Sequence, residues 1–277
     1  MPDLSVEQFQ SLSQQIYQKL GLHFDEKKIY FLKTRVAKRM AILGIENTRE
    51  YLFMLHYADT QGLEMQALAN LVTTNETYMF REYDQLQAFA NYCLPEVLSA
   101  KQARGEKSLR IWCAGCSSGE EAYTLAMIVQ EVFPQATTWD CEIVATDIDE
   151  NMLARVAAAR YGARSVGDVP EEYRQKYLIE DGDEWLVRRR TAALVKPRHL
   201  NLSDRMGMRS MRGFDFVYCR NVLIYFDDAS RKAVVDHFYN ALNPGGYIFL
   251  GHSESIGRVT TAFKLKRFEN HLVYVKE

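Results

Sequence analysis

Residues 111–121 read Ile-Trp-Cys-Ala-Gly-Cys-Ser-Ser-Gly-Glu-Glu, and this stretch decides the fold. The apolar run that ends at Cys113 favours a buried strand, the small residues at 115–119 favour a loop, and the two glutamates favour the first turn of a helix. Because small residues let a ligand approach the backbone closely, the loop is a candidate binding site. A tight strand-to-helix turn without a ligand has the same pattern, so this segment alone leaves both interpretations open.

The chain on both sides of this stretch alternates between strand and helix patterns. The predicted strands span 108–113, 141–146, 214–219, 247–251 and 271–275, and the predicted helices span 119–133, 150–160 and 228–242. This alternation is typical of an α/β fold in which helices cover both faces of a parallel sheet. Residues 170–199 interrupt it with a short helix and strand-like pieces, so we expect an inserted subdomain at about 165–200.

Residues 1–75 have only helical patterns and form a separate predicted domain. Apolar residues recur at helical spacing from Val6 to Leu20, and Gly21 then provides a stop. Further helices are expected over 26–43, from 48 onward and around 63–72. Residues 76–106 are expected to link this all-α domain to an α/β domain at 107–277, mostly as a helix over 83–103.

The composition of the 277-residue chain limits the classes of protein to consider. Hydrophobic residues make up 47%, which excludes a mainly disordered chain, and the net charge of −2 argues against nucleic-acid binding by bulk charge. The five cysteines are an odd number, which favours a reducing compartment over a disulfide framework. There is no signal-peptide pattern and no apolar run approaches ~20 residues, so we expect a cytoplasmic protein without membrane insertion.

Asp147 ends the second predicted strand, at the same edge of the sheet as the small-residue loop. An acidic residue there is placed to accept both ribose hydroxyls of an adenosine-type cofactor, whereas Asp149 fits a helix cap better. These two features do not separate NAD from S-adenosylmethionine. No third glycine is present for a pyrophosphate, and Glu120 and Glu121 would repel one, which favours S-adenosylmethionine.

Cysteine and histidine chemistry has weaker support. Residues 112–116, Trp-Cys-Ala-Gly-Cys, resemble the Trp-Cys-x-x-Cys motif of thioredoxins. Cys113, however, ends a strand, and the two glutamates that follow would raise a thiol pKa, which disfavours a redox function. No second pair of Cys or His residues has ligand spacing, so we predict no metal site.

Three further segments, together with the loop at 115–121, carry a resemblance to a known family. They are Thr-Thr-Asn-Glu-Thr-Tyr-Met-Phe-Arg at 73–81, Phe-Asp-Phe-Val-Tyr-Cys-Arg-Asn-Val-Leu-Ile-Tyr-Phe at 214–226, and Leu-Asn-Pro-Gly-Gly-Tyr-Ile-Phe-Leu-Gly-His-Ser-Glu at 242–254. Over nearly its whole length the chain resembles the CheR family of chemotaxis-receptor glutamate methyltransferases. The resemblance implies an all-α N-terminal domain followed by a Rossmann-like class I methyltransferase domain with a small inserted β-subdomain.

The resemblance also implies a function. The methyl group of S-adenosyl-L-methionine would be transferred to glutamate side chains of bacterial chemoreceptors, which gives S-adenosyl-L-homocysteine and the glutamate methyl esters used in sensory adaptation. The partner would be the cytoplasmic helical region of a receptor, and we expect a monomer. Two alternatives remain open: methylation of another protein or a small molecule, and a non-catalytic adaptor that binds S-adenosylmethionine.

Residue roles follow from the same resemblance. Arg81 and Tyr225 would stand near the transferred methyl group and orient the substrate glutamate. Asp147 would hold the ribose, and Asn201 and Leu202 would lie beside the adenine. The full set of positions implied to bind the cofactor is Asn75, Thr77, Arg81, Gly115, Glu121, Asp147, Asn201, Leu202, Arg220 and Asn221.

Receptor recognition is assigned to the second predicted helix. Lys28, Arg35 and Arg39 lie within about 40° of one another around this helix, with Lys38 further round. Charge alone fits a solvated basic face as well, but the corresponding helix of the family faces the acidic methylation region of the receptor. The inserted subdomain resembles one that docks a receptor pentapeptide in some members. Since the loop at 179–184 is shorter and more acidic here, we expect a pentapeptide-independent enzyme.

Overall fold

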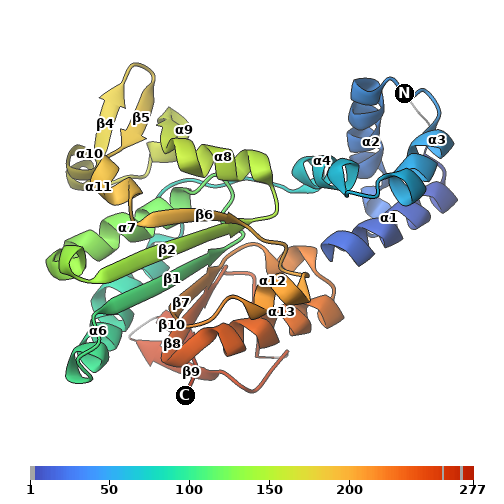
Figure 1. Cartoon of the computed structure of the whole chain (residues 1–277). Helices are drawn as coiled ribbons and strands as arrows, with labels where there is room; N and C mark the ends of the chain where they lie inside the picture. The colour runs from blue at the N-terminus through green and yellow to red at the C-terminus, as the bar shows by residue number, and fades with distance from the viewer. Residues whose placement is uncertain (1–3, 258, 269–270) are drawn as a thin grey trace.

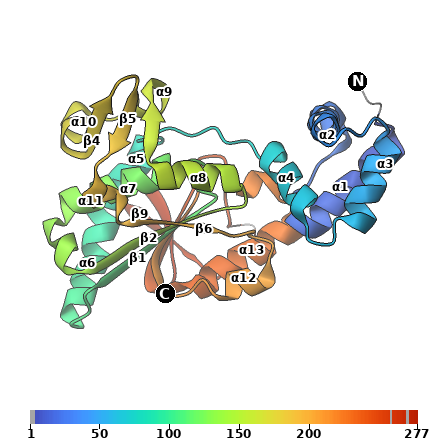
Figure 2. The same ribbon diagram turned by 45° about the horizontal axis from the view of Figure 1, so that its top comes forward.

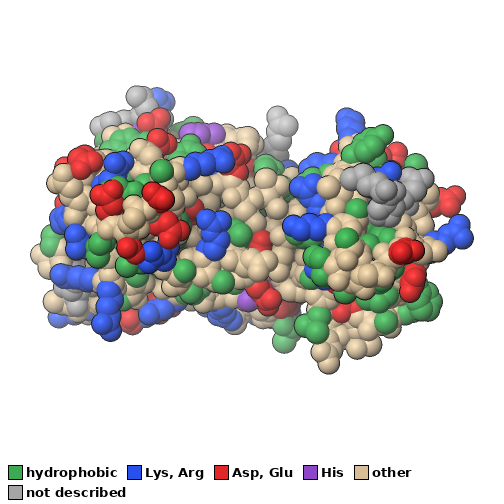
Figure 3. Space-filling model, turned by 90° about the horizontal axis from the view of Figure 1, so that it is seen from above, with side chains coloured by type: hydrophobic (Ala, Val, Ile, Leu, Met, Phe, Trp, Pro, Cys, Tyr) green, Lys and Arg blue, Asp and Glu red, His purple; other side chains and the backbone are tan. Residues whose placement is uncertain are grey.

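The computed structural model describes residues 4–257, 259–268 and 271–277. The chain forms an all-α N-terminal domain and a larger α/β domain, seen as two lobes with a narrower region between them (Figures 1 and 3). Within the described residues, no helix is both long and apolar enough to span a membrane. The N-terminal helices are α1 (Val6–Leu20), α2 (Ile29–Leu43), α3 (Thr48–Phe53) and α4 (Leu63–Val72), with a 3-10 turn at Glu26–Lys28 and a π-helical turn at Met54–Ala58.

The first two helices show how the N-terminal domain obtains its core. α1 begins at a capping box, in which the side chains of Ser5 and Gln8 each accept from the backbone N–H of the other, and it ends where Gly21 is left-handed (φ 74°). Apolar residues three and four positions apart on α1 and α2 face each other and exclude water. The buried residues of the two helices are Phe9, Leu12, Ile16, Leu20, Leu32, Val36 and Met40.

The two domains are joined by an irregular segment and a long helical stretch. Residues 73–82 form no regular helix or strand, and the helical stretch consists of α5 (Tyr83–Ala88), a π-helical turn (Phe89–Cys93) and α6 (Leu94–Ala103). The wider π-helical turn accommodates the proline in the first turn of α6, which has no N–H to donate. α1 also contacts the second domain, since the Tyr17 hydroxyl donates to Asp227 Oδ2 at 3.0 Å, beside α13 (Asp228–Ala241) (Figure 2).

A seven-stranded sheet forms the centre of the second domain, with the strand order β6-β2-β1-β7-β8-β10-β9. The first five strands of this order are parallel, whereas β10 is antiparallel to β8, and β9 is antiparallel to β10. The expectation of an entirely parallel sheet is therefore wrong at this end, because the described residues between β8 and β9 form no crossover helix of the kind that joins parallel neighbours. The strands are β1 (Ser108–Ala114), β2 (Asp140–Asp147), β6 (Val195–His199), β7 (Phe214–Cys219), β8 (Leu242–Leu250), β9 (Lys264–Phe268) and β10 (His271–Val275).

Alternate residues of the central strands face two different layers of helices. On β1, Ile111 and Cys113 belong to the core shared with α6, α7 (Glu120–Val132) and α8 (Glu150–Ala158). Trp112 and Ala114 belong to the core shared with α12 (Arg205–Arg209) and α13. Both faces of the sheet are thus covered, as expected for an α/β domain (Figure 1).

A small antiparallel sheet with the strand order β3-β5-β4 projects from this domain (Figure 1). The small sheet starts at residue 160, earlier than the insertion expected at about 165–200. β6, which lies near the C-terminal end of that expected insertion, belongs to the large sheet instead. Pairing of β6 with β2 joins residues far apart in the sequence, which periodicity alone does not reveal. The elements of this region are β3 (Arg160–Gly162), α9 (Ala163–Val166), α10 (Glu171–Tyr177), β4 (Leu178–Asp181), β5 (Glu184–Val187) and α11 (Arg189–Ala192).

Candidate active site

A cavity lies between the two domains at the carboxyl ends of β1, β2 and β7. It encloses about 900 Å³ of space, part of which is open to solvent. Ligands of open α/β sheets bind at this edge, which makes the cavity the candidate site for a small-molecule cofactor. Every residue that the sequence analysis placed at the cofactor or the methyl group lines it, namely Asn75, Thr77, Arg81, Gly115, Glu121, Asp147, Asn201, Leu202, Arg220, Asn221 and Tyr225.

The small-residue loop after β1 is held to the end of β2. The N–H groups of Gly115 and Cys116 both donate to the Thr146 carbonyl at 2.8 Å. Gly115 is left-handed (φ 78°), and a Cβ there would lie 2.5 Å from Val222 Cγ2, so glycine is required for the close approach of the two loops. Ser117 is also left-handed (φ 48°), and its buried hydroxyl has no partner within the described residues. Such a hydroxyl at a cavity wall is expected where a ligand completes the hydrogen bonding.

Asp147 is 7% exposed, and its carboxylate is fixed by two backbone donors. Ser117 N–H donates to one oxygen at 2.7 Å, and Asp149 N–H donates to the other at 2.9 Å. Burial raises the pKa of Asp147, and these donors partly offset that effect. Asp149 itself accepts from Asn151 N–H and from the Asn75 side chain, both at 2.9 Å. Asp149 therefore caps α8, as the sequence indicated, and Asp147 is the acid at the cavity wall.

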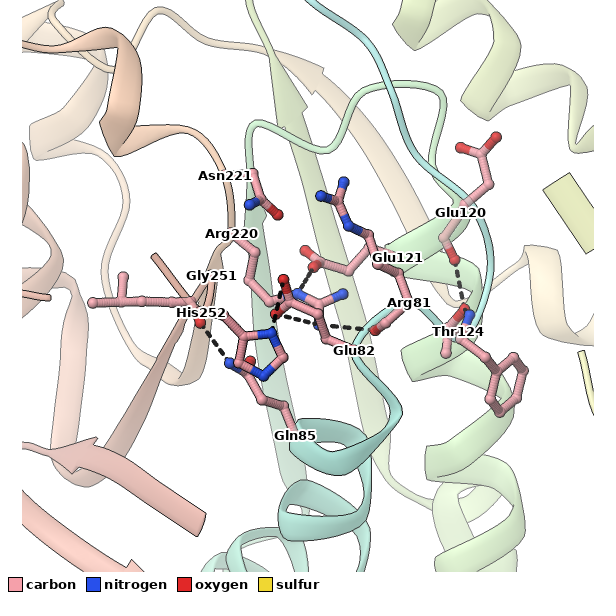
Figure 4. A network of polar contacts seen from close by, with 12 residues as sticks. Arg81, Glu82, Gln85, Glu120, Glu121, Thr124, Arg220, Asn221, Gly251 and His252 are labelled. Atoms are coloured by element: carbon pink, nitrogen blue, oxygen red, sulfur yellow. Dashed lines mark hydrogen bonds and ion pairs between the residues drawn. The ribbon is translucent and has the colours of Figure 1, made fainter. Parts of the chain in front are cut away.

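Arg220 is the centre of a nearly buried charge network (Figure 4). Its side chain is 5% exposed; Nε donates to Glu121 Oε2 at 2.5 Å, and Nη1 donates to the Arg81 carbonyl at 3.0 Å. Glu82 Oε2 lies 3.4 Å from the same Nη1. Burial acts to lower the pKa of Arg220, but the charges of Glu121 and Glu82 outweigh it and raise the pKa. The guanidinium thereby fixes the linker at residues 81–82 to the start of α7.

Arg81 and Tyr225 reach the cavity from the linker and from the loop after β7. Arg81 Nη1 donates to the Glu76 carbonyl at 2.9 Å, and its guanidinium carbon lies 5.8 Å from the centre of the Tyr78 ring. The Tyr225 carbonyl accepts from His23 N–H at 2.9 Å, so the N-terminal domain holds the backbone of this loop. Within the described residues Arg81 forms no ion pair, which leaves its charge available to an anionic group in the cavity.

The two cysteines of the loop after β1 do not have the properties of a redox site. Burial raises the pKa of the Cys113 and Cys116 thiols well above the ordinary value. A thiol of this kind is protonated at neutral pH and is a poor nucleophile. The thioredoxin-like interpretation of residues 112–116 therefore has no support in the geometry.

The N-terminal domain supplies part of the cavity wall, which the sequence pattern does not reveal. Leu20 and Leu22, at the end of α1 and just after it, line the cavity, and the Asn201 side chain donates to the Lys19 carbonyl at 2.9 Å. The apolar character of both leucines fits a helix core equally well. The other lining residues that were not predicted include Thr73, Thr74, Ile148, Leu200, Val222 and Phe226, of which the first two belong to the motif at 73–81.

The four basic residues predicted to form a receptor-facing surface of the second helix differ in their surroundings, and Lys28 lies in the 3-10 turn just before α2. Arg39 donates to both oxygens of Glu64 on α4, at 2.9 and 2.6 Å, and its side chain is 15% exposed. Arg35 is half-buried, whereas Lys28 and Lys38 are exposed. Glu64 thus neutralises the charge of Arg39 at the edge of the helical core. The freely exposed charges of the predicted surface are Lys28 and Lys38.

These surroundings fit S-adenosylmethionine better than a dinucleotide. S-adenosylmethionine has an adenosine, a cationic sulfonium and an ammonium group, and it has no phosphate. The cavity offers the carboxylates of Asp147 and Glu121 and the unpaired Ser117 hydroxyl. A pyrophosphate would need open backbone N–H groups in the loop, but those at 115–117 already donate to Thr146 and Asp147.

Both domains match models of one protein family. Residues 7–73 match the CheR methyltransferase, all-alpha domain, and residues 75–271 match the CheR methyltransferase, SAM binding domain. Chemotaxis protein methyltransferase 2 of Vibrio cholerae serotype O1 is 38% identical over 262 residues, which cover 94% of this chain and 89% of that protein. A chemotaxis protein methyltransferase of Borreliella burgdorferi is 33% identical, with 87% of this chain and 85% of that protein covered.

A third relative, chemotaxis protein methyltransferase 1 of Pseudomonas aeruginosa, is 32% identical over 92% of both proteins. The similarity therefore extends over the helical domain as well as the α/β domain. The predicted fold class and the predicted cofactor, S-adenosyl-L-methionine, are confirmed. From the cavity, its carboxylates and the match over both domains, we conclude that the chain belongs to the CheR family of S-adenosylmethionine-dependent methyltransferases.

Proposed function

We propose that this chemotaxis methyltransferase transfers the methyl group of S-adenosyl-L-methionine to glutamate side-chain carboxylates of bacterial chemoreceptors, forming glutamate methyl esters. The observation that carries the proposal is Arg81, a cation at the cofactor cavity that forms no ion pair within the described residues. Arg220, by contrast, is neutralised by Glu121 and Glu82. An available guanidinium beside the methyl donor suits an anionic carboxylate substrate, because guanidinium and carboxylate form strong charge-assisted hydrogen bonds.

The residues of the chain contribute mainly by positioning. A glutamate carboxylate is ionised at neutral pH, so the reaction needs no strong general base. S-adenosylmethionine supplies, when bound, a methyl group activated by its sulfonium. Arg81 and Tyr225 orient the carboxylate by hydrogen bonds, and the wall formed by Leu20 and Leu22 limits the access of water. Orientation of the reacting groups lowers barriers by several kcal/mol in favourable cases, and removal of water strengthens the electrostatic interactions.

Substitution of Arg81 is expected to reduce turnover more than substitution of Tyr225. Arg81→Ala removes a full charge from the carboxylate site and should lower kcat by about 100-fold, whereas Tyr225→Phe removes one neutral hydrogen bond and should lower it by about 10-fold. The measurement is the initial rate of methyl transfer to a receptor fragment at saturating cofactor. Arg104→Ala is a matched control, since Arg104 is exposed and neither it nor its ion-pair partner Glu106 lines the cavity. Wild-type turnover in both variants would contradict the assigned roles.

The exposed charges of Lys28, just before α2, and of Lys38, on α2, support recognition of an acidic receptor segment. Reversing two exposed charges, in Lys28→Glu/Lys38→Glu, should raise the KM for the receptor by about 10-fold and leave the affinity for S-adenosylhomocysteine unchanged. The effect should shrink as salt is added, because exposed charges are screened. Lys107→Glu is the control, since this residue precedes β1 at the opposite edge of the sheet. Equal losses of cofactor affinity and receptor affinity would mean that the helix acts through the fold instead.

The substrate class is tested with purified cytoplasmic fragments of chemoreceptors. We compare fragments that have glutamates at the candidate positions with variants in which these residues are replaced by glutamine, which has the same shape but no carboxylate. Transfer to the first set and none to the second is expected. Equal transfer to both sets would direct the search to another nucleophile.

A further inference from the structure

The segment Gly251-His252-Ser253-Glu254 follows β8. Its last residue uses a single carboxylate oxygen to join two strand ends. Glu254 Oε2 accepts the N–H of Asn221 at 2.7 Å and the N–H of Gly251 at 2.8 Å. The two amides stand just beyond the ends of β7 and β8, which are neighbours in the sheet and pair as far as Cys219 and Leu250. Glu254 therefore acts at the edge of the sheet where the cofactor cavity lies.

The backbone of Asn221 is left-handed, with φ 60°. Asparagine adopts this conformation more readily than other residues that have a Cβ, and the Glu254 carboxylate fixes it by accepting the Asn221 N–H. Gly251 allows the anchor to come close: a Cβ at this position would lie 2.9 Å from Asn221 N and 2.9 Å from Glu254 Oε2. The glycine, the carboxylate and the left-handed asparagine thus form one closely packed unit.

This unit fixes the loop that carries several cavity residues. Arg220 directly precedes Asn221, and Val222 directly follows it and packs against Gly115, where a Cβ would come within 2.5 Å of the valine. The next residues form a 3-10 turn, Leu223–Tyr225, in which the Tyr225 N–H donates to the Val222 carbonyl at 3.1 Å. Movement of the Asn221 backbone is therefore transmitted to the cofactor loop on one side and to Tyr225 on the other.

An ordinary surface role does not account for Glu254. Within the described residues it forms no ion pair, and its second oxygen, Oε1, is buried without a hydrogen-bond partner. A carboxylate in this position is therefore not balancing a cation of the described chain. What it does is accept two converging backbone N–H groups, and a charged acceptor binds these more strongly than a neutral one.

We propose that Glu254 is a positioning residue of the methyltransferase site, which acts through Asn221 to hold the cofactor-binding loop and Tyr225. The role of Glu254 in cofactor binding is inferred from these contacts alone, whereas its role in turnover rests on the proposed function. Glu254→Ala should weaken binding of S-adenosylhomocysteine by about 10-fold and lower kcat by about 100-fold, since small misplacements of reacting groups have effects of this size. Glu254→Gln keeps an acceptor oxygen in place and should restore both quantities to within about 3-fold of wild type.

The test is titration calorimetry of S-adenosylhomocysteine with the full chain, followed by receptor methylation. Ser255→Ala is the matched control: it removes the neighbouring contact of Ser255 Oγ with the Tyr274 hydroxyl (3.2 Å) and should bind as the wild type does. Wild-type affinity in Glu254→Ala, or a loss in Glu254→Gln as large as in Glu254→Ala, would overturn the proposal. If Glu254→Ala does not fold, Glu254→Asp decides, because the shorter side chain cannot reach both amides and should weaken binding; wild-type affinity there would also overturn it.

The two readouts separate this inference from the proposed function. Binding of S-adenosylhomocysteine is measured without a receptor, so the pattern of affinities tests Glu254 whatever the substrate is. Reduced affinity in Glu254→Ala together with absent receptor methylation by the wild-type enzyme would retain the positioning role and reject the proposed substrate. Normal receptor methylation by the wild type, together with unchanged affinity and turnover in Glu254→Ala, would retain the proposed substrate and reject the positioning role.

Discussion

Replacement of Arg220 by alanine is expected to lower the affinity for S-adenosylhomocysteine by about 100- to 1000-fold and to reduce methyl transfer accordingly. The expectation rests on the position of the guanidinium between Glu121 and Glu82, whose side chains are 13% and 11% exposed. Without the arginine, two carboxylates that have little contact with water lose their common cation, and the Arg81 carbonyl loses its donor. The loss of affinity follows from movement of Arg81 and Glu121, which line the cavity and are no longer held in place by the guanidinium.

A lysine at position 220 separates charge from geometry. Arg220→Lys retains the positive charge, but a single ammonium cannot reproduce donation from Nε to Glu121 together with donation from Nη1 to the Arg81 carbonyl. We expect an intermediate loss of about 10-fold, by titration calorimetry and by initial rates. Arg198→Ala serves as a control, since Arg198 bonds Ser210 away from the cavity lining. Wild-type affinity in Arg220→Ala would show that the network is not needed for cofactor binding.

The second large effect concerns stability. Lys101→Met is expected to lower the free energy of unfolding by about 3–5 kcal/mol, the usual cost of breaking a buried ion pair from one side. Lys101 Nζ lies 3.0 Å from Asp215 Oδ1, and the side chains are only 4% and 3% exposed. Asp215 also accepts from Arg110 N–H and from the Asn243 side chain, both at 2.9 Å. Both hydrogen-bond donors would remain in Lys101→Met, but the Asp215 carboxylate would lose the ammonium group beside it.

Equilibrium unfolding in urea measures this loss, provided that the transition is two-state. The double variant Lys101→Met/Asp215→Asn should recover a large part of the stability, because it removes the buried charge together with its partner. Cofactor affinity of the folded single variant should be unchanged, since neither residue lines the cavity. A loss below about 1 kcal/mol in Lys101→Met would mean that water or another group compensates the aspartate.

Local patterns were sufficient for much of the fold. The strand, small-residue loop and helix at 108–133, and the acid at the end of the next strand, are recognisable because each depends on residues close together in sequence. The hydrophobic pattern failed to predict strands that pair with distant parts of the chain or that have few apolar residues. β9 alternates Lys264, Leu265 and Lys266 on an exposed edge and was not predicted. β8 begins at Leu242, five residues before the strand predicted at 247–251, and its pairing with β7 is irregular there.

The same distinction applies to the site. Motifs at 73–81, at 115–121 and around 220 led to residues that do share one cavity. Partners on separate elements gave no such signal: Arg39 has the spacing of a basic helix face, yet Glu64 on another helix neutralises it. Glu254 likewise follows an apolar strand as an ordinary loop residue would, and only the fold brings it to Asn221. Contacts between distant residues carry no periodicity, so a single sequence does not reveal them.

One measurement tests the central claim most directly: transfer of labelled methyl from S-adenosylmethionine to purified chemoreceptor cytoplasmic fragments, scored as label released by alkali. Glutamate methyl esters hydrolyse in base, whereas methyl groups on nitrogen do not. We predict base-labile label on receptor glutamates, and its loss in Arg81→Ala. Absence of label, with S-adenosylhomocysteine still bound by the same preparation, would contradict the proposed substrate and leave a methyltransferase of the CheR family that acts on another acceptor.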